Sequence, residues 1–143
     1  MPTSLRLLGL VLVAVFAAAC STEDATRPGP RESAVRAAAE STVRLAVAAA
    51  NVHASEGDSY VGFDAAAAEQ IEPSLNWLDG TEPQTGDDVS IVVASNDELL
   101  VVTRSEGEYV CGVGTFVSSE TRIGAADSFT AVDTVEECTS AAA

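Results

Sequence analysis

From Arg31 to about His53 the chain shows the hydrophobic period of an α-helix. At about 100° per residue, small apolar residues fall on one side of this segment and polar residues fall on the other. Charged residues from Glu32 to Arg44 alternate in sign four positions apart, so neighbours attract one another along the polar side. The pattern predicts a long amphipathic helix whose alanine-rich face lets a second layer approach closely. The residues expected on that face are Val35, Ala38, Ala39, Thr42, Leu45, Ala46, Ala49 and Ala50.

A second, shorter helix is predicted after a loop. Gly57 and Asp58 break the first helix. Asp64 can cap a helix from Ala65 to about Ile71, because a carboxylate accepts hydrogen bonds from the free N–H groups of the first turn. Pro73 stops this helix. The apolar anchors expected around it are Tyr60, Val61 and Phe63 before the helix and Leu75, Trp77 and Leu78 after it.

Strand signals begin at Val89, after a polar loop over residues 79–88. Three β-branched segments joined by short turns predict an antiparallel meander, with weaker strand signals around residues 128–135. Val89, Ile91 and Val93 are expected to share one face of the first strand. The fold class predicted is therefore α+β, a long N-terminal helix packed on a small antiparallel sheet. The three segments are 89–94, 99–103 and 109–116.

The N-terminal segment has the features of an export signal. After Arg6, an apolar run from Leu7 to Ala19 would span only about 20 Å as a helix, less than the roughly 30 Å of a hydrocarbon core. Ala17, Ala18 and Ala19 end the run, and Cys20 follows. This junction resembles the lipobox of bacterial lipoproteins, in which the cysteine is acylated and becomes the first mature residue.

The lipobox resemblance implies a protein held at the cell membrane by fatty acyl chains, such as palmitate, on Cys20 and facing outside the cytoplasm. Residues 1–19 would be the signal peptide, residues 20–30 the acylated cysteine with a polar tether of about 30 Å, and residues 31–143 the folded domain. Two alternatives stay open. An ordinary signal peptidase cutting at the same bond would release a soluble secreted protein, and an uncleaved segment would act as an anchor.

The cysteine count agrees with lipidation. The chain has three cysteines, so one thiol has no intramolecular partner. If Cys20 carries lipid, Cys111 and Cys138 form an even pair in an oxidising compartment. A bond between them would close a loop of 138 − 111 = 27 residues and stabilise the domain by roughly 3–4 kcal/mol. The sequence thus predicts a disulfide-closed C-terminal region.

Charge limits the possible partners. Seven arginines stand against 22 acidic residues, for a net charge of −15, and removal of residues 1–19 would leave 6 − 22 = −16. Such a surface repels phosphate backbones, so nucleic-acid binding is not expected. It also disfavours adsorption to anionic lipid, so a membrane attachment must be covalent or inserted.

Catalytic and metal chemistry have little support. His53 is the single histidine and stands near a helix end without a nucleophile signature, so we expect no catalytic site. One histidine and two oxidised cysteines cannot fill a tetrahedral zinc site, and no cofactor is expected. Calcium is the most plausible metal, but the acidic turns lack the alternating spacing of a calcium loop. These turns hold Asp87 and Asp88, and Asn96, Asp97 and Glu98.

Two further motifs are best explained by packing. Gly112 and Gly114 lie within a strand pattern and lack the helix and third glycine of a phosphate site, so a bulge or a close approach is expected. Tyr60, Trp77 and Tyr109 are expected in the core rather than on a ligand surface.

The order of these parts resembles the head domains of type IV pilins and pseudopilins, especially Gram-positive ones. The resemblance rests on three segments and covers about residues 33–138. They are VRLAVAAANVHASEGDSYVGF, AAAAEQIEPSLNW and VSIVVASNDELLVVTRSEGEYVCGV. The resemblance implies a long helix laid across a small antiparallel sheet with a disulfide-closed C-terminal region. Because no apolar run follows Cys20, the helix that packs in a pilus core is missing. The chain is similar to a pilin head mounted on a lipid.

Three functions follow, in order of preference. The first is a non-enzymatic cell-surface lipoprotein that acts by protein or cell-wall contacts. The second is a surface lipoprotein that binds a small molecule or a metal, with the loop at 79–88 and the aromatic residues framing a pocket. The third is an enzyme with a pair of carboxylates, which ranks last because 22 acidic residues produce pairs by chance.

Overall fold

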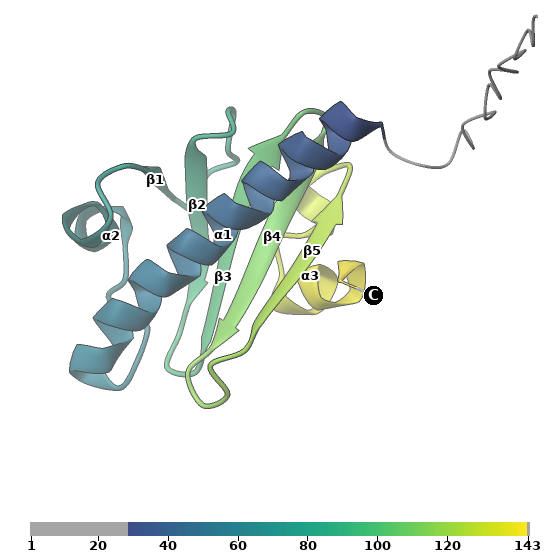
Figure 1. The fold of residues 1–143 in the computed structure, drawn as a ribbon. Coiled ribbons are helices and arrows are strands. Elements are labelled where there is room, and N and C mark those ends of the chain that lie inside the picture. The colour runs from purple at the N-terminus through teal and green to yellow at the C-terminus, as the bar shows by residue number, and fades with distance from the viewer. Residues whose placement is uncertain (1–28, 143) are drawn as a thin grey trace, which may run out of the picture.

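The computed structural model describes residues 29–142 as three layers. The long helix α1 crosses one face of a five-stranded sheet, with α2 beside it, and α3 lies against the other face (Figure 1). The α+β class predicted from sequence is confirmed, as is the long N-terminal helix. The elements are α1 (Pro30–Gly57), α2 (Ala65–Ile71), β1 (Asn76–Asp79), β2 (Asp88–Ala94), β3 (Glu98–Ser105), β4 (Glu108–Thr115), β5 (Thr121–Ala126), a 3-10 helix (Phe129–Ala131) and α3 (Val135–Ala141).

The sheet has the order β1-β2-β3-β4-β5, and the predicted antiparallel meander forms its centre as β2, β3 and β4. The prediction of a wholly antiparallel sheet was wrong at one edge, where β1 pairs with β2 in parallel. After β1 the polar loop carries the chain back to the level where β1 began, so β2 runs in the same direction as β1. Four residues of β1 are too few to show an alternating pattern, so this strand was not visible in the sequence.

The C-terminal part also differs from the prediction. Strand β5 lies at 121–126, before the segment where strand signals were seen, and the polar segment around Cys138 is the helix α3. The helix begins where it does because the Thr134 side chain caps its first turn. The Thr134 hydroxyl accepts a bond from the Glu137 N–H at 3.2 Å and donates to the Glu137 carboxylate at 2.8 Å.

Helix α1 buries a different stripe from the one predicted. Val43, Val47 and Ala54 are buried, whereas Ala38 is exposed and Leu45 is 40% exposed. The buried face is therefore rotated around the helix, because the sheet contacts the stripe that includes the two valines. The face also contains Ala39, Ala46, Ala49 and Ala50, as expected.

Two glycines of β4 explain this rotation. A Cβ atom on Gly112 would lie 2.2 Å from Cγ1 of Val43, and one on Gly114 would lie 3.1 Å from Cγ1 of Val47. The valines of α1 thus fill the space that side chains of β4 would occupy, which confirms the predicted close approach at these glycines. The other face repeats the arrangement, since a Cβ on Gly124 of β5 would lie 2.3 Å from the carbonyl oxygen of Cys138 in α3.

Strand β2 also departs from its predicted pattern. Its pairing with β3 shifts between Ile91 and Val93, which indicates a bulge. Val89 and Ile91 pack in the core beneath α1, but Val93 packs with the core beneath α3. The prediction that all three share one face was therefore wrong for Val93, because the extra residue reverses the alternation.

The segment between α1 and the sheet follows the sequence closely. Asp58 ends α1 in the left-handed conformation with φ of 53°, and the Asp64 carboxylate caps α2 by accepting from the Ala67 N–H at 2.9 Å. Trp77 is buried, and its indole N–H donates to the carbonyl of Glu72 at 2.8 Å. Leu75 and Leu78 are half-buried.

Substitution of Gly112 by alanine should destabilise the domain by about 1–3 kcal/mol, because the added methyl overlaps Val43 and the core has no room to yield. Chemical denaturation would measure the loss. Gly57→Ala is the matched control, since nothing lies within 4 Å of its added Cβ, and it should be neutral or stabilising. Val43→Ala should restore part of the stability of Gly112→Ala. Equal effects at both glycines would contradict the close approach.

Candidate functional site

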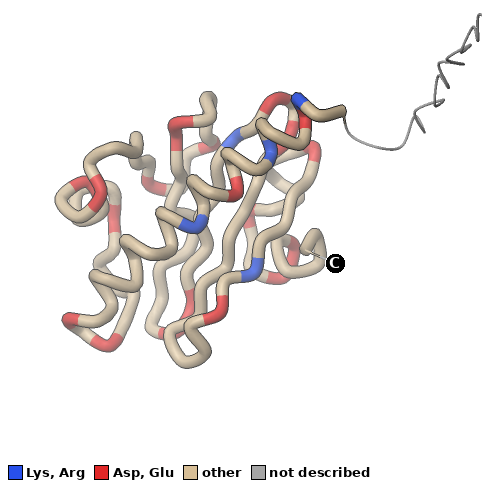
Figure 2. The backbone as a smooth tube through the Cα atoms, viewed as in Figure 1, with Lys and Arg blue, Asp and Glu red and all other residues tan. Residues whose placement is uncertain are grey.

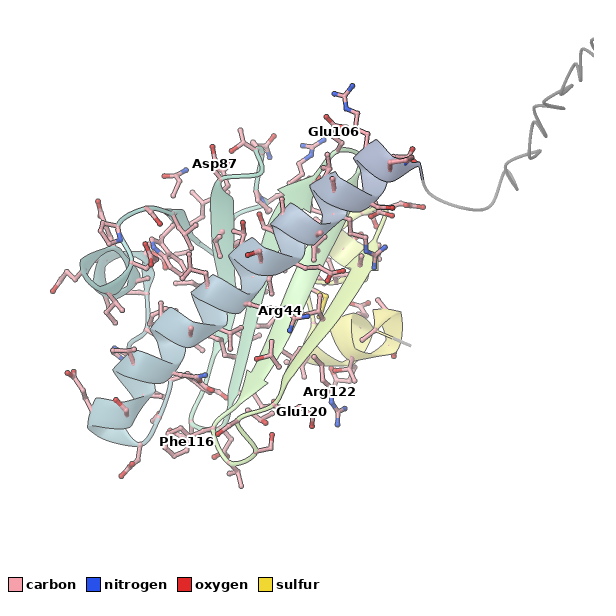
Figure 3. All side chains as sticks on the ribbon, in the orientation of Figure 1. Arg44, Asp87, Glu106, Phe116, Glu120 and Arg122 are labelled. Atoms are coloured by element: carbon pink, nitrogen blue, oxygen red, sulfur yellow. A yellow bond between two sulfur atoms is a disulfide. The ribbon has the colours of Figure 1, made fainter. Side chains whose placement is uncertain are left out.

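One end of the molecule, here called the tip, is built from three loops. They are the loop after α1 (residues 58–64), the β2–β3 turn (95–97) with the first residue of β3, and the β4–β5 turn (116–120). Backbone bonds join them, because the Tyr60 N–H donates to the carbonyl of Ser95 at 3.1 Å and the Phe116 N–H donates to that of Asp97 at 3.0 Å. Figure 3 shows Phe116 and Glu120 at this end, near the end of α1, and Asp87 and Glu106 at the opposite end.

The tip exposes apolar side chains. Val61 is 59% exposed and Val117 is 86% exposed, and Val52 on the last turns of α1 is 52% exposed. Val61 was expected to anchor its loop, but Tyr60 and Phe63 on either side are buried and leave Val61 outside. Val61 and Val117 therefore stand on loops, and Val52 stands on the helix beside them.

Tyr60 is the main anchor of the tip. It is fully buried, its hydroxyl donates to Oδ1 of Asn51 at 2.7 Å, and its ring meets Phe116 edge to face with 6.3 Å between centroids. Burial raises the pKa of this hydroxyl above its ordinary value. The residue joins α1 to both loops that carry exposed valines, and this connection holds their positions.

His53 has a structural role here. Its Nε2 lies 3.1 Å from the carbonyl oxygen of Val61, and its ring packs against Phe63 with 5.5 Å between centroids. The histidine near the helix end thus holds the loop that presents Val61. The sequence placed His53 near the helix end but carried no sign of this partner.

Charges divide the molecule into two regions. No arginine or lysine occurs from Leu45 to Thr103, a stretch that contains eleven acidic residues. Figure 2 shows the blue arginine positions along the first half of α1 and on the sheet, whereas α2 and the loop after α1 carry red acidic positions and no blue ones. Ion pairs hold the first half of α1 to the β3–β4 turn, with Arg31 3.6 Å from Glu106 and Arg36 3.6 Å from Glu108.

Two grooves flank this first half of α1, at the end opposite the tip. The larger, of about 590 Å³, lies between α1 and residues 84–87, and the other, of about 480 Å³, lies on the opposite flank over the β3–β4 turn. Val35, Ala38 and Thr42, which were predicted to be buried, line the larger groove because α2 covers only the second half of the helix.

The aromatic residues do not frame these grooves. Tyr60 and Trp77 belong to the core beneath α1, and Tyr109 belongs to the core beneath α3. The Arg104 guanidinium lies over the ring of Tyr109, with Cζ 5.5 Å from the ring centroid. Tyr109 donates a hydrogen bond to Glu82. That bond raises the pKa of the Tyr109 hydroxyl, with burial as a second cause. The expected core packing of the three aromatics is confirmed.

Asp88 organises the polar loop before β2. Its buried carboxylate accepts bonds from Nδ2 of Asn76 at 2.6 Å and from the N–H groups of Gln84 and Thr85 at 2.8 and 2.9 Å. These donors, the Asn76 amide first, hold the pKa of Asp88 below its ordinary value. Asp87 beside it is exposed at the larger groove.

The two acidic turns that were considered for calcium are separate in space. Asp87 lies by the groove, and Asn96, Asp97 and Glu98 lie at the tip. Across residues 29–142, no three His, Cys, Asp or Glu side chains gather closely enough to hold a metal ion. A different carboxyl pair, Asp133 and Glu137, meets at the start of α3, where burial and then Glu137 raise the pKa of Asp133.

The predicted disulfide is present. Cys111 of β4 and Cys138 of α3 are bonded and fully buried, so α3 is covalently fixed to the centre of the sheet. Cys20, the predicted lipidation site, lies outside the described residues. Within the part of the chain that is described, none of the helices is both long and apolar enough to cross a membrane.

Replacing Cys111 and Cys138 together by alanine should lower the free energy of unfolding by about 3–4 kcal/mol, because the bond closes a 27-residue loop. Comparison of the double variant with the reduced and oxidised parent by denaturation would measure this. The reduced parent should resemble the double variant. An oxidised parent no more stable than the variant would mean that the bond does not constrain the chain.

Asp88→Asn should destabilise the protein by about 1–3 kcal/mol at pH 7, because buried N–H donors lose a charged acceptor. The lowered pKa means that the stabilisation by Asp88 is complete above its unfolded value, near 4, and is lost as pH falls through the folded value. The difference between parent and variant should therefore shrink in acid. Asp87→Asn, an exposed neighbour, should change stability little at either pH.

Comparisons with known proteins give no family for this chain. No protein-family model matches it, and neither a curated protein nor a solved structure is significantly similar to it. The function must therefore be inferred from the chain's own residues, its disulfide, its charge and its exposed tip.

Proposed function

We propose that this protein is a non-enzymatic cell-surface lipoprotein with a pilin-like head. Acyl chains on Cys20 hold it at the outside of the cell membrane, and the head acts by contact with a protein or with the cell wall. The sequence of residues 7–20 supports the anchor, and the Cys111–Cys138 bond supports an oxidising compartment.

The arrangement of the two ends supports this proposal most directly. The 28 residues of α1 span about 42 Å, with the chain from Cys20 entering at Pro30 and the tip formed around the other end. A lipid on Cys20 would therefore join the head at the end that carries the grooves, and the exposed valines lie at the other end. This is the geometry of a display protein.

The pilin-like description rests on three features of the head. A long helix lies across an antiparallel meander, a short helix follows it, and a disulfide closes the C-terminal region. Two features lie outside the expected pattern, namely the parallel strand β1 and the helix α3 on the second face. Strand β1 extends the sheet at one edge and α3 covers its second face, which suits a head that stands alone on a lipid.

The use of the polar residues supports contact over catalysis. His53 holds a loop, Asp88 holds another, and the two cysteines hold α3. Ligand binding in the larger groove is the second candidate, favoured by its volume of about 590 Å³ and by an apolar wall of Val35 and Ala38. The wall is short, and the opposite side is formed by the loop at 84–87.

Cys20→Ser should release the protein from the membrane fraction, because the acyl chains would have no attachment point. Fractionation of the producing cell and mass spectrometry of the mature N-terminus would test this, with Ser21→Ala as the control that keeps the anchor. The parent should carry acyl mass on Cys20. An unmodified Cys20, or one bonded to Cys111 or Cys138, would overturn the proposal.

A further inference from the structure

We infer that the tip is a docking surface for a basic protein segment, in which apolar side chains are flanked by lysine or arginine. The inference deepens the proposed function and depends on it only for the cellular location of the partner. Its chemistry comes from the tip itself, where exposed valines and acidic residues occur together.

The apolar part of the surface comes from separate loops held together. Val61 and Val117 are 56 positions apart in sequence, and the Tyr60–Phe116 contact brings their loops to one end of the molecule. Both loops are bonded to the β2–β3 turn through backbone groups. A partner therefore meets an ordered surface, and little conformational entropy is lost on binding.

The acidic part of the surface favours a partner with positive charge. Glu56, Asp58, Asp97 and Glu98 are exposed around the end of α1 and the β2–β3 turn, within the stretch that has no arginine or lysine. On the other side Arg122 lies beside Glu120 (Figure 3). Complementary charge favours lysine and arginine on a partner, especially toward α1.

The same charge disfavours other occupants. A second copy of this chain would bring a like-charged surface against the tip, and anionic polymers would be repelled. A purely cationic polymer would leave the valines exposed to water. A segment with both apolar and basic side chains satisfies both parts of the surface.

A defined peptide would test the inference. The probe is a fluorescent peptide with three central leucines and two lysines at each end, titrated by anisotropy against the full chain purified in detergent as the cell produces it. One companion peptide has serine for leucine, and another has glutamate for lysine. The first peptide should bind, and the affinity of each companion peptide should be lower by a factor of about ten or more.

Variants locate the site. Val61→Ser with Val117→Ser should weaken binding about tenfold, because burial of both valines is lost. Asp97→Asn with Glu98→Gln should weaken it about threefold and flatten its salt dependence. Asp127→Asn with Glu136→Gln makes the same charge change at exposed positions outside the tip and should alter affinity less than about twofold. The substituted side chains are exposed, and unchanged thermal unfolding would show that each variant is folded.

The inference is overturned if the control pair weakens binding as much as the tip pair, since attraction would then be non-specific. It is also overturned if either companion peptide binds as tightly as the first, or if the valine variants bind normally. If Cys20 carries no acyl chains but the peptide binds normally, only the proposed anchor is overturned. Absence of peptide binding by an acylated protein would overturn the docking surface alone.

Discussion

The structure depends on the close approach of α1 to β4. Gly112 and Gly114 leave a depression in the sheet, and Val43 and Val47 fill it. This contact sets which stripe of the helix is buried and where the helix lies across the strands. The grooves at one end and the exposed tip at the other both follow, because a helix of 28 residues is much longer than strands of eight.

The second face uses the same principle with a covalent addition. Gly124 lets the backbone of α3 approach β5, and the bond between Cys111 and Cys138 fixes that helix to the sheet. A short helix of seven residues buries little apolar area by itself. The disulfide compensates by restricting the unfolded chain, so a small C-terminal element can cover a large part of the second core.

Features with local signals were predictable from the sequence. Residues close in the chain determine the extent of α1, the cap at Asp64 and the three central strands. The cysteine pair was predictable because two cysteines remain once Cys20 is assigned to the lipid. The rotation of α1 was not predictable, because alanine on several sides makes the apolar face broad and the choice is made by distant glycines. The bulge that turns Val93, the short parallel β1 and the bond from His53 to Val61 likewise depend on tertiary contacts.

The same tertiary contacts create the candidate site. Val61 is an ordinary loop valine in the sequence, and it is exposed only because Tyr60 and Phe63 turn inward and His53 holds the carbonyl of the loop. Val117 follows Phe116, whose ring packs against Tyr60 of this loop. A protein that needed only solubility would gain from polar residues at both positions, and the surrounding acidic stretch already supplies charge. The presence of exposed valines on loops with buried anchors, at the end remote from Pro30, is therefore the feature that distinguishes the tip from a general acidic surface.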